Sequence, residues 1–457
     1  MIIVNFPYNI SNLRQQSGRA GRRKKDSLSI LVGGSFPIDQ HYMAHPDEIF
    51  LKPNLALSVD LENILTREGH IQCAAHEMPI EPLRDRAYFG NDLPAIAAER
   101  LIKDNGGFYH SHPNFNPYPS RHVAIRNCEE SGYAIIDVTN NRNVVLEEIE
   151  PSRAIFILYE GGIFLHQGRS YLVRSFSQEE SLARVEAVNV NWTTSCRDFT
   201  DVDPIETELV RHVPESKSKA FFGKIRITSV VFGFFKLDKH KRILDAVEVE
   251  NRPLVLSAKG FWIDIPRSAL DIIRAHRMNA AAAVHAAEHA VMSLFPSFLV
   301  GATSGDDLRT ECKAPEKEFA QKETSRKRPA RLIFYDRTNA GTSKKAFEFV
   351  FELLKRAVER VEGCKACVNG CPECCCGERC REGNAVVSKH GAAVVLRCIL
   401  GWEIDESWLA EVAEEGERGW DGGKETVIPA DEVGGRAVVE IKEESVEESS
   451  RFANCIS

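Results

Sequence analysis

Seven of the thirteen cysteines fall between residues 364 and 380, and this density indicates metal chemistry. Four thiolates can hold a zinc ion tetrahedrally, with Zn–S distances of about 2.3 Å, and an iron–sulfur cluster also needs four cysteines. Local crowding of this kind favours a metal site over a disulfide framework. The sequence therefore predicts zinc, with iron–sulfur as the alternative. Spacing alone leaves the ligands open among Cys364, Cys367, Cys371, Cys374, Cys375, Cys376 and Cys380.

A second chemical signal is the run Gln-Ser-Gly-Arg-Ala-Gly-Arg at residues 16–22. Arg19 and Arg22 are three positions apart, so they share one face where a helix begins. A guanidinium group suits the charge that builds on the γ-phosphate of ATP during hydrolysis, and glycine lets the backbone approach a ligand closely. A solvated basic helix is the alternative. The position of the run, after an apolar strand, favours the phosphate-facing interpretation.

The other half of an ATP site has no counterpart in this sequence. No Gly-x-x-x-x-Gly-Lys-[Ser/Thr] run occurs in the 457 residues, so there is no phosphate-binding loop with its lysine. Asp47 and Glu48 superficially resemble an ATPase Asp-Glu box, but no apolar strand precedes them. We therefore expect a fragment or a truncated gene model, with ATP and Mg²⁺ held by a lobe that these residues do not supply.

Apolar periodicity and turn residues predict a series of elements. Two strands of a parallel α/β unit should flank the basic helix, a helical region and a β-rich region should follow, and an Ala-rich helix should come next. A last helix should end at Gly363, before the cysteines. The predicted ranges are strands 2–4 and 29–32, helices over 54–108, β-structure over 121–265 with strands 133–136, 154–159 and 229–235 and turns 140–143 and 166–169, helix 266–294, strand 331–336 and helix 345–361.

Two weaker patterns have both a structural and a functional interpretation. His285 and His289 have the i, i+4 spacing of a zinc pair, but the sequence indicates no third ligand, so a packed or capping role is favoured. The phenylalanines of the β-rich region could stack on bases, although a place in the core of the sheet is favoured. They are Phe221, Phe222, Phe232, Phe234 and Phe235.

Charge is distributed unevenly along the chain. The formal net charge is −8, but sixteen acidic and four basic residues in 403–448 give that segment −12 and leave the remainder near +4. A positive remainder is compatible with a polyanionic partner. The basic run 326–328 has the composition of a nuclear-import signal, with a solvated linker as an even alternative.

The arginine run and the cysteine cluster, with much of the chain between them, resemble one family. It is the RecQ-like DNA helicase family with a C-terminal cysteine domain, which includes the fungal and plant homologue of the human RecQ-like helicase number four and the bacterial MrfA type. The arginine run looks like motif VI of superfamily 2 helicases. The resemblance runs over about residues 1–400 and is carried by 6–8 (Phe-Pro-Tyr), 14–23, 73–75 with Glu77, 159–168, 285–289, 370–374, Cys380 and 388–389.

This resemblance implies a multidomain α/β and α+β protein: the C-terminal half of an ATP-dependent 3′-to-5′ DNA helicase that acts in repair of crosslinks and bulky lesions in the nucleus. It implies single-stranded and forked DNA as partners, with no membrane. The implied domains are the C-terminal part of the second RecA-like lobe (1–50), a winged helix (51–110), a β-rich domain (111–265), a helical, zinc-binding domain (266–400) and an acidic tail (401–457).

The resemblance also implies roles for particular residues. Arg19 and Arg22 would face the γ-phosphate, with Gln16 and Gly18 beside the nucleotide. The zinc ligands would be Cys367, Cys371, Cys374 and Cys380, because these match the family's four cysteines. The alternative function is a non-catalytic, zinc-containing DNA-binding or scaffold module, and a more remote one is an iron–sulfur nuclease-like protein.

Overall fold

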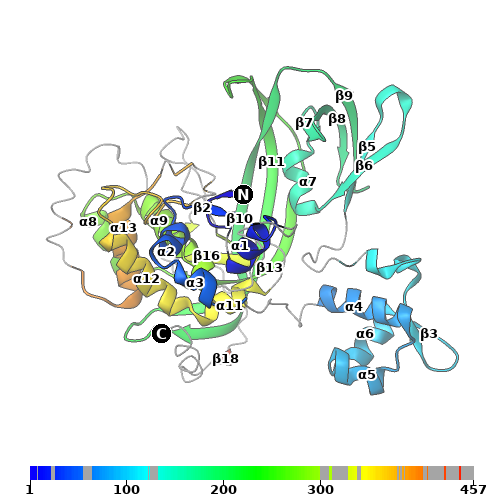
Figure 1. Ribbon diagram of the computed structural model, residues 1–457, viewed down its shortest axis with the longest axis horizontal. Helices are drawn as coiled ribbons and strands as arrows, with labels where there is room; N and C mark the ends of the chain where they lie inside the picture. Colours follow the sequence, from blue (N-terminus) through cyan, green and yellow to red (C-terminus); the bar gives the residue numbers. More distant parts are fainter. Residues whose placement is uncertain are drawn as a thin grey trace.

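The chain is a mixed α/β protein, which confirms the predicted fold class (Figure 1). Among the described residues, no helix is both long and apolar enough to cross a membrane. A computed structural model describes residues 1–7, 9–21, 26–54, 64–121, 123, 132–298, 308–310, 328–336, 341–377, 380, 383–384, 386–404, 409, 427–428 and 442–443.

The first unit is the predicted parallel one. Strand β1 (Ile2–Val4) pairs in parallel with β2 (Ile30–Val32), and helix α1 (Ile10–Ser17) lies between them in sequence. Helices α2 (Pro37–Ala44) and α3 (Asp47–Leu51) follow. Burial of apolar side chains from all these segments forms a small separate core. Its members are Ile3, Phe6, Ile10, Leu13, Ile38 and Tyr42.

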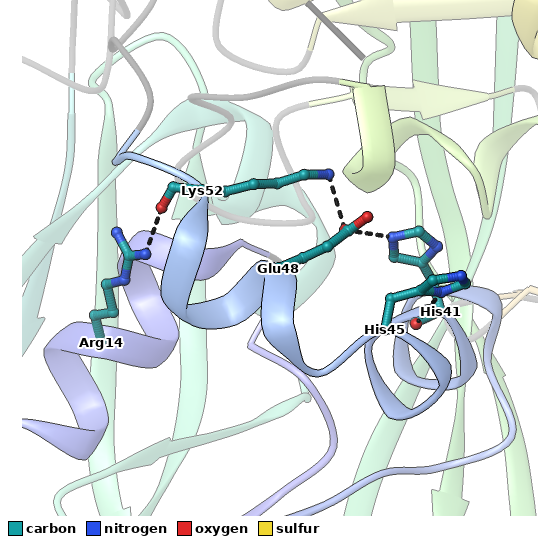
Figure 2. A network of polar contacts seen from close by, with 5 residues as sticks. All are labelled: Arg14, His41, His45, Glu48 and Lys52. Carbon is teal, nitrogen blue, oxygen red and sulfur yellow. Dashed lines mark hydrogen bonds and ion pairs between the residues drawn. The ribbon is translucent and has the colours of Figure 1, made fainter. Parts of the chain in front are cut away.

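Arg14 ties α1 to the segment that follows α3 (Figure 2). Its guanidinium donates to the carbonyl oxygen of Ile49 at 2.9 Å, to the Asn54 side-chain oxygen at 2.8 Å, and to the carbonyl oxygen of Lys52. A planar guanidinium suits several acceptors at once because its donors point in fixed directions. Arg14 therefore has a structural role in positioning α1.

Glu48 links the two short helices of this unit. Its carboxylate lies 2.8 Å from the ring Nε2 of His41 and 2.8 Å from Nζ of Lys52 (Figure 2). These partners lower the pKa of Glu48 below its usual value, against an opposing desolvation effect. Glu48 lies in a helix and is engaged in a local ion-pair network, which agrees with rejecting it as part of an Asp-Glu box.

A small helical unit follows, drawn in blue at the lower right of Figure 1. It contains α4 (Ile64–Glu77), α5 (Pro82–Phe89), α6 (Leu93–Arg100) and the hairpin of β3 (Ile102–Lys103) with β4 (Tyr109–His110). The predicted helical region is thus confirmed where it is described. Two short 3₁₀ turns, Pro113–Phe115 and Pro119–Arg121, end the unit. Its core comprises Ile71, Ala75, Ile80, Leu93, Ile96, Ala97 and Leu101.

The β-rich region contains a five-stranded sheet with the order β6-β5-β9-β8-β7. Both predicted hairpin turns are confirmed. Asn140 and Asn141 have positive φ within the 3₁₀ turn Thr139–Asn141, and Gln167 and Gly168 have positive φ between β7 and β8. The strands are β5 (Tyr133–Asp137), β6 (Val144–Ile149), β7 (Ile163–His166), β8 (Arg169–Ser177) and β9 (Leu182–Val188).

One predicted strand of this region is a helix. Residues 154–159 were expected to be extended, but α7 covers Pro151–Ile157. Pro151 occupies the first turn, where its fixed φ favours a helix and its missing N–H costs no hydrogen bond. Ala154 and Ile155 are buried. The apolar run was therefore a buried helical face, which periodicity over so few residues does not distinguish from a strand.

A seven-stranded sheet forms the centre of the molecule. Its order is β14-β16-β13-β11-β10-β18, with β12 paired to β11. The long antiparallel strands β10 and β11 run in Figure 1 from the helical layer towards the smaller sheet. The predicted strands 229–235 and 331–336 are confirmed. The strands are β10 (Thr193–His212), β11 (Lys219–Leu237), β12 (Ile243–Glu248), β13 (Leu254–Asp264), β14 (Leu308–Thr310), β16 (Arg331–Asp336) and β18 (Lys442–Glu443), and β15 (Arg328–Pro329) pairs separately with β17 (Val427–Ile428).

A layer of helices packs on one end of this sheet and carries the largest core. Phe261, Phe334 and Phe347 are fully buried where sheet and helices meet. Phe222 and Phe234 are also buried, which confirms the core interpretation for these two phenylalanines. The helices are α8 (Arg267–Ala275), α9 (Ala280–Met292), α10 (Phe295–Phe298), α11 (Thr342–Glu348), α12 (Val350–Gly363) and α13 (Lys389–Leu400).

Two predicted helices are interrupted. The predicted helix 266–294 divides into α8 and α9 because Arg277 takes a positive φ of 55° and Asn279 starts a new helix. The Asn279 side-chain oxygen accepts hydrogen bonds from the backbone N–H groups of Ala281 and Ala282, which is how a strong N-cap acts. The predicted helix 345–361 likewise divides at Phe349, although its end at Gly363 is confirmed.

We predict that Arg14→Ala loosens α1 from the segment after α3. Loss of charged hydrogen bonds to buried or half-buried acceptors should lower the free energy of unfolding of this unit by about 1.5–3 kcal/mol. Backbone amides around residues 49–54 should exchange hydrogen faster. Urea unfolding and hydrogen-exchange mass spectrometry measure both effects. Arg19→Ala, the matched control from the end of the same helix, should leave both unchanged, and equal effects of the two variants would contradict this role.

Candidate functional site

The end of α1 brings together three of the predicted nucleotide-facing residues. Gly18 is the C-cap, and its N–H donates to the carbonyl oxygen of Arg14 at 2.9 Å. Gln16 is half-buried, while Gly18 and Arg19 are exposed on the following turn. The fourth predicted residue, Arg22, lies outside the described residues. The predicted position at the start of a helix is wrong for Arg19, because α1 ends at Ser17 and Arg19 lies in the turn that follows it.

Arg14 and Arg19 differ in their surroundings. Arg14 is engaged with three acceptors, one within α3 and two from the segment after it. Within the described part of the chain, the side chain of Arg19 has no hydrogen-bond or ion-pair partner, and it is exposed. The guanidinium of Arg19 is therefore available to an external anion, whereas that of Arg14 is not.

The cysteine loop between α12 and α13 brings four thiols together. Cys364 and Cys367 follow the end of α12, and Cys371 and Cys374 lie in the next turn. Their four sulfur atoms lie within 4.8 Å of one another. The sulfur–sulfur distances are 3.8 Å for 364–367, 3.6 Å for 364–371, 3.5 Å for 367–374 and 3.7 Å for 371–374.

These distances fit a zinc ion. Four sulfurs at about 2.3 Å from a central ion form a tetrahedron whose edges are about 3.8 Å, close to the observed separations. In the described part of the chain every cysteine is a free thiol, so disulfides do not compete for these sulfurs. The cluster therefore has the chemistry and size of a closed structural zinc site.

The loop is held by backbone hydrogen bonds and by one buried lysine. Lys389, the first residue of α13, is 7% exposed. Its ammonium donates to the carbonyl oxygens of Cys364 at 2.6 Å and Cys367 at 3.1 Å. The backbone N–H of Cys371 also points at the sulfur of Cys374, at 3.3 Å. These contacts orient the thiols from outside, as the surroundings of metal sites commonly do.

The thiols differ in how readily they ionise. A hydrogen bond between the thiols of Cys374 and Cys375, whose sulfurs are 3.6 Å apart, lowers the pKa of Cys374. Burial raises the pKa of both Cys367 and Cys371. The thiolate of Cys374 therefore forms readily, whereas ionisation of Cys367 and Cys371 is disfavoured. A divalent cation at the centre would remove that obstacle because it stabilises all the thiolates together.

The structure differs from the predicted ligand set at one position. Cys367, Cys371 and Cys374 converge as expected, but the fourth sulfur beside them is that of Cys364. Cys380 lies instead with His285 and His289. Cys380 is six positions beyond Cys374 in the chain, and its sulfur lies 3.5 Å from Nε2 of His285 on α9. Two Cys-x-x-Cys pairs, 364–367 and 371–374, were the sequence signal for the observed group.

The other two cysteines beside the four converging thiols, Cys375 and Cys376, are buried. Cys375 packs in the largest core, and its sulfur lies close to Gly370, where an added Cβ would approach it at 2.9 Å. Burial raises the pKa of Cys376 to about 11, so its thiol stays neutral. Neither belongs to the group of four converging sulfurs.

The sequence pattern also missed a third partner for the histidine pair. His285 and His289 are buried, and the sulfur of Cys380 reaches them from a segment 95 positions away in the chain. Burial lowers the pKa of His289, so the ring is neutral at pH 7. No sequence spacing reports such a contact, because it depends on how α9 packs against the cysteine loop.

Two family models match segments of the chain. The model "ATP-dependent helicase HRQ1, winged helix domain" matches residues 59–128, and "MrfA Zn-binding domain" matches residues 287–375. The first match covers the helical unit of α4 to α6 with its hairpin. The second begins within α9 and ends one residue after Cys374, so it includes all four converging cysteines.

Two named relatives match almost the full length of the chain. The ATP-dependent helicase HRQ1 of Saccharomyces cerevisiae is 47% identical over 442 residues, which are 94% of this chain and 41% of that protein. The chain belongs to the HRQ1/MrfA-type family of RecQ-like helicases. The ATP-dependent helicase hrq1 of Schizosaccharomyces pombe is 40% identical over 410 residues, 88% of this chain and 38% of that protein. The chain thus spans about two fifths of the length of these HRQ1 relatives.

A solved structure shares the fold. A crystal structure of the DUF1998 helicase MrfA bound to DNA matches with a TM-score of 0.50 and 20% identity, over 87% of this chain and 52% of that chain. The match to a zinc-binding domain model and the four converging thiols together support zinc as the metal of this family member.

We predict that Cys371→Ser removes one zinc equivalent and destabilises the surrounding domain. Its sulfur is 3.6 Å from that of Cys364 and 3.7 Å from that of Cys374, so its loss opens the tetrahedron, and metal binding is coupled to folding in such loops. Elemental analysis and thermal unfolding measure both effects. Cys375→Ser and Cys376→Ser, the matched controls, should retain the metal. Loss of zinc in either control, or a full complement in Cys371→Ser, would contradict the assignment, and iron with labile sulfide would contradict zinc itself.

Proposed function

We propose that this chain forms the C-terminal part of an ATP-dependent DNA helicase and supplies the arginines that act on the γ-phosphate. The observation that carries this proposal is the exposed Arg19 in the turn after α1, within a parallel α/β unit, whose side chain has no partner among the described residues. Membership of the HRQ1/MrfA-type family supports it, because the relatives are named ATP-dependent helicases.

In this proposal ATP and Mg²⁺ bind to a lobe with a phosphate-binding loop, and α1 faces them. Arg19 and Arg22 stabilise the charge that develops on the γ-phosphate as its bond to ADP breaks. Gly18 adds no side chain where the backbone comes close, and Gln16 contacts the nucleotide from the preceding turn. Arg14 does not contact the nucleotide. It acts indirectly, because it fixes α1 against α3 and the segment after it.

The proposed division of the chain follows the family. It consists of a RecA-like portion (1–50), a winged helix (51–110), a β-rich domain (111–265), a zinc-binding domain (266–400) and an acidic tail (401–457). In the zinc-binding domain we assign the ion to Cys364, Cys367, Cys371 and Cys374. Four thiolates leave no coordination position for water, so the role of this zinc is structural.

DNA is the proposed partner, and the nucleus the proposed location. The acidic tail, 401–457, has 16 acidic and five basic residues, so residues 1–400 have a formal charge of +3. A positive surface favours a polyanion. A winged-helix domain and the named helicase relatives agree with DNA as the substrate. Single-stranded and forked DNA are the expected forms, with repair of crosslinks or bulky lesions as the context.

A chimera tests the proposal directly. We predict that the 457-residue chain alone binds forked DNA but shows no DNA-stimulated ATP turnover, because it has no phosphate-binding loop to hold the β- and γ-phosphates. Replacing the matching segment of S. cerevisiae HRQ1 with this chain should restore turnover and unwinding. Turnover by the chain alone at ordinary helicase rates would contradict the first expectation. A folded, DNA-binding chimera without turnover would favour the non-catalytic DNA-binding or scaffold function instead.

Variants of that chimera test the arginines. We predict that Arg22→Ala lowers ATP turnover by about 10³-fold, the range for arginines that stabilise a transferring phosphoryl group. Arg19→Ala should also lower turnover strongly, while neither variant should change DNA affinity. Lys52→Ala removes a positive charge from the same unit without touching α1, and it should keep turnover within a few-fold. Near-normal turnover in both arginine variants would contradict their assignment.

A further inference from the structure

We propose that His285, His289 and Cys380 form a second metal site, separate from the four-cysteine cluster, that takes zinc or a similar transition-metal ion. The three potential ligand atoms lie within 4.8 Å of one another. Two come from one helix, and the third comes from the loop that follows the first cluster. The proposal does not depend on helicase activity.

The helix α9 places its two histidines on one face. Residues four apart lie one above the other on a helix, and the two Nε2 atoms are 2.7 Å apart. His285 is 2% exposed and His289 4% exposed. Two buried imidazoles lose much of their hydration, and a shared metal ion or a hydrogen bond between the rings can compensate for that loss at the Nε2 atoms.

The other side of each ring is fixed by its surroundings. Nδ1 of His285 lies 2.8 Å from the carbonyl oxygen of Val386, which can only accept a hydrogen bond. Nδ1 of His285 therefore donates to this oxygen, which leaves Nε2 as the ring atom that can act as a metal ligand. A backbone carbonyl bound to the far nitrogen is the usual arrangement around metal-ligating histidines. Gly377 packs against Nδ1 of His289, where an added Cβ would approach it at 2.3 Å.

Cys380 completes the group from outside α9. Its sulfur lies 3.5 Å from Nε2 of His285. Two ligands on a tetrahedral zinc, one nitrogen at about 2.0–2.1 Å and one sulfur at about 2.3 Å, are separated by about 3.6 Å. Asn384 holds the intervening loop closed, because its side chain accepts from the N–H of Gly377 and donates to its carbonyl oxygen, both at 2.9 Å.

The ligand types define the class of metal. Imidazole and thiolate favour zinc and related transition metals, whereas Ca²⁺ and Mg²⁺ prefer oxygen ligands. Three protein ligands leave a fourth position for water or another group. Two nitrogens on one tetrahedral zinc are separated by about 3.3 Å, so binding requires a small rotation of one ring from the 2.7 Å separation. A direct hydrogen bond between the two rings, without any ion, is the competing explanation for that short distance.

Metal counts on the full chain decide between these explanations. After gel filtration with a weak chelator, the wild-type chain should retain two zinc equivalents by elemental analysis. Cys364→Ser should lose one equivalent and so should Cys380→Ser, a conservative change at a half-buried residue. His289→Ala should also lose one, and His289→Ala combined with Cys371→Ser should lose both. Cys398→Ser, a free cysteine on α13, is the matched control and should keep two.

Two further measurements keep the outcome decisive. Circular dichroism identifies any variant that fails to fold. If His289→Ala does not fold, the zinc content of Cys380→Ser decides the question. The one cobalt(II) equivalent retained by Cys371→Ser should show thiolate charge-transfer absorption of about one sulfur, since Cys380 is the one thiolate of the second site. One zinc equivalent in the wild type, lost in Cys380→Ser but kept in Cys364→Ser, would overturn the second site and restore Cys380 to the first. Two equivalents retained in both Cys380→Ser and His289→Ala would also overturn it.

Discussion

The close contact between helices α9 and α13 is the constraint on which the four converging thiols and the His285–His289–Cys380 group both depend. Small residues line this contact, and a Cβ added at Gly391 would lie 2.5 Å from the Cβ of Ala283. Helices approach so closely only where side chains are small, because protein interiors have no spare volume. The contact fixes the start of α13, where Lys389 reaches the carbonyl oxygens of the cysteine loop. It also fixes Val386, three positions before the first residue of α13, and the carbonyl oxygen of Val386 orients the ring of His285.

The electrostatics of this region follow from that packing. Four thiols are held at separations near 3.6 Å beside a buried core, where several thiolates cannot coexist without a compensating charge. Lys389 supplies one positive charge from the α13 side, and Arg360 of α12 supplies another while donating to the carbonyl oxygen of Glu373 at 2.5 Å. Burial lowers the pKa of Arg360 despite the nearby thiols. Two monovalent cations at the rim cannot replace a divalent ion at the centre, so metal binding and folding of this loop are one process.

Sequence reasoning succeeded where the signal was local. The parallel unit around α1, the strand β16 and the end of α12 at Gly363 each follow from apolar runs and stop signals within a few residues. It failed where a role depends on distant partners. The Cys-x-x-Cys pair 364–367 favoured Cys364 by spacing, but no spacing placed Cys380 beside the two histidines of α9.

Other failures have similarly physical causes. The run that became α7 was too short for its periodicity to separate strand from helix. The break between α8 and α9 depends on the Asn279 cap and the positive φ of Arg277, and strong helix propensity on both sides concealed it. The histidine pair on α9 was recognisable from its spacing, but its third partner comes from a loop that is remote in sequence.

Arg14 and Arg19 show why partners, and not residue type, determine function in this chain. Both belong to the same short arginine-rich run, and both carry an identical guanidinium. Arg14 is satisfied by acceptors of its own unit, so it can only position α1. Arg19, one turn later, remains exposed, so its charge is available to a phosphate that another lobe presents. The proposed catalytic role of Arg19 thus depends on the structural role of Arg14, because an exposed guanidinium acts at a defined place only if the helix before it is held rigidly.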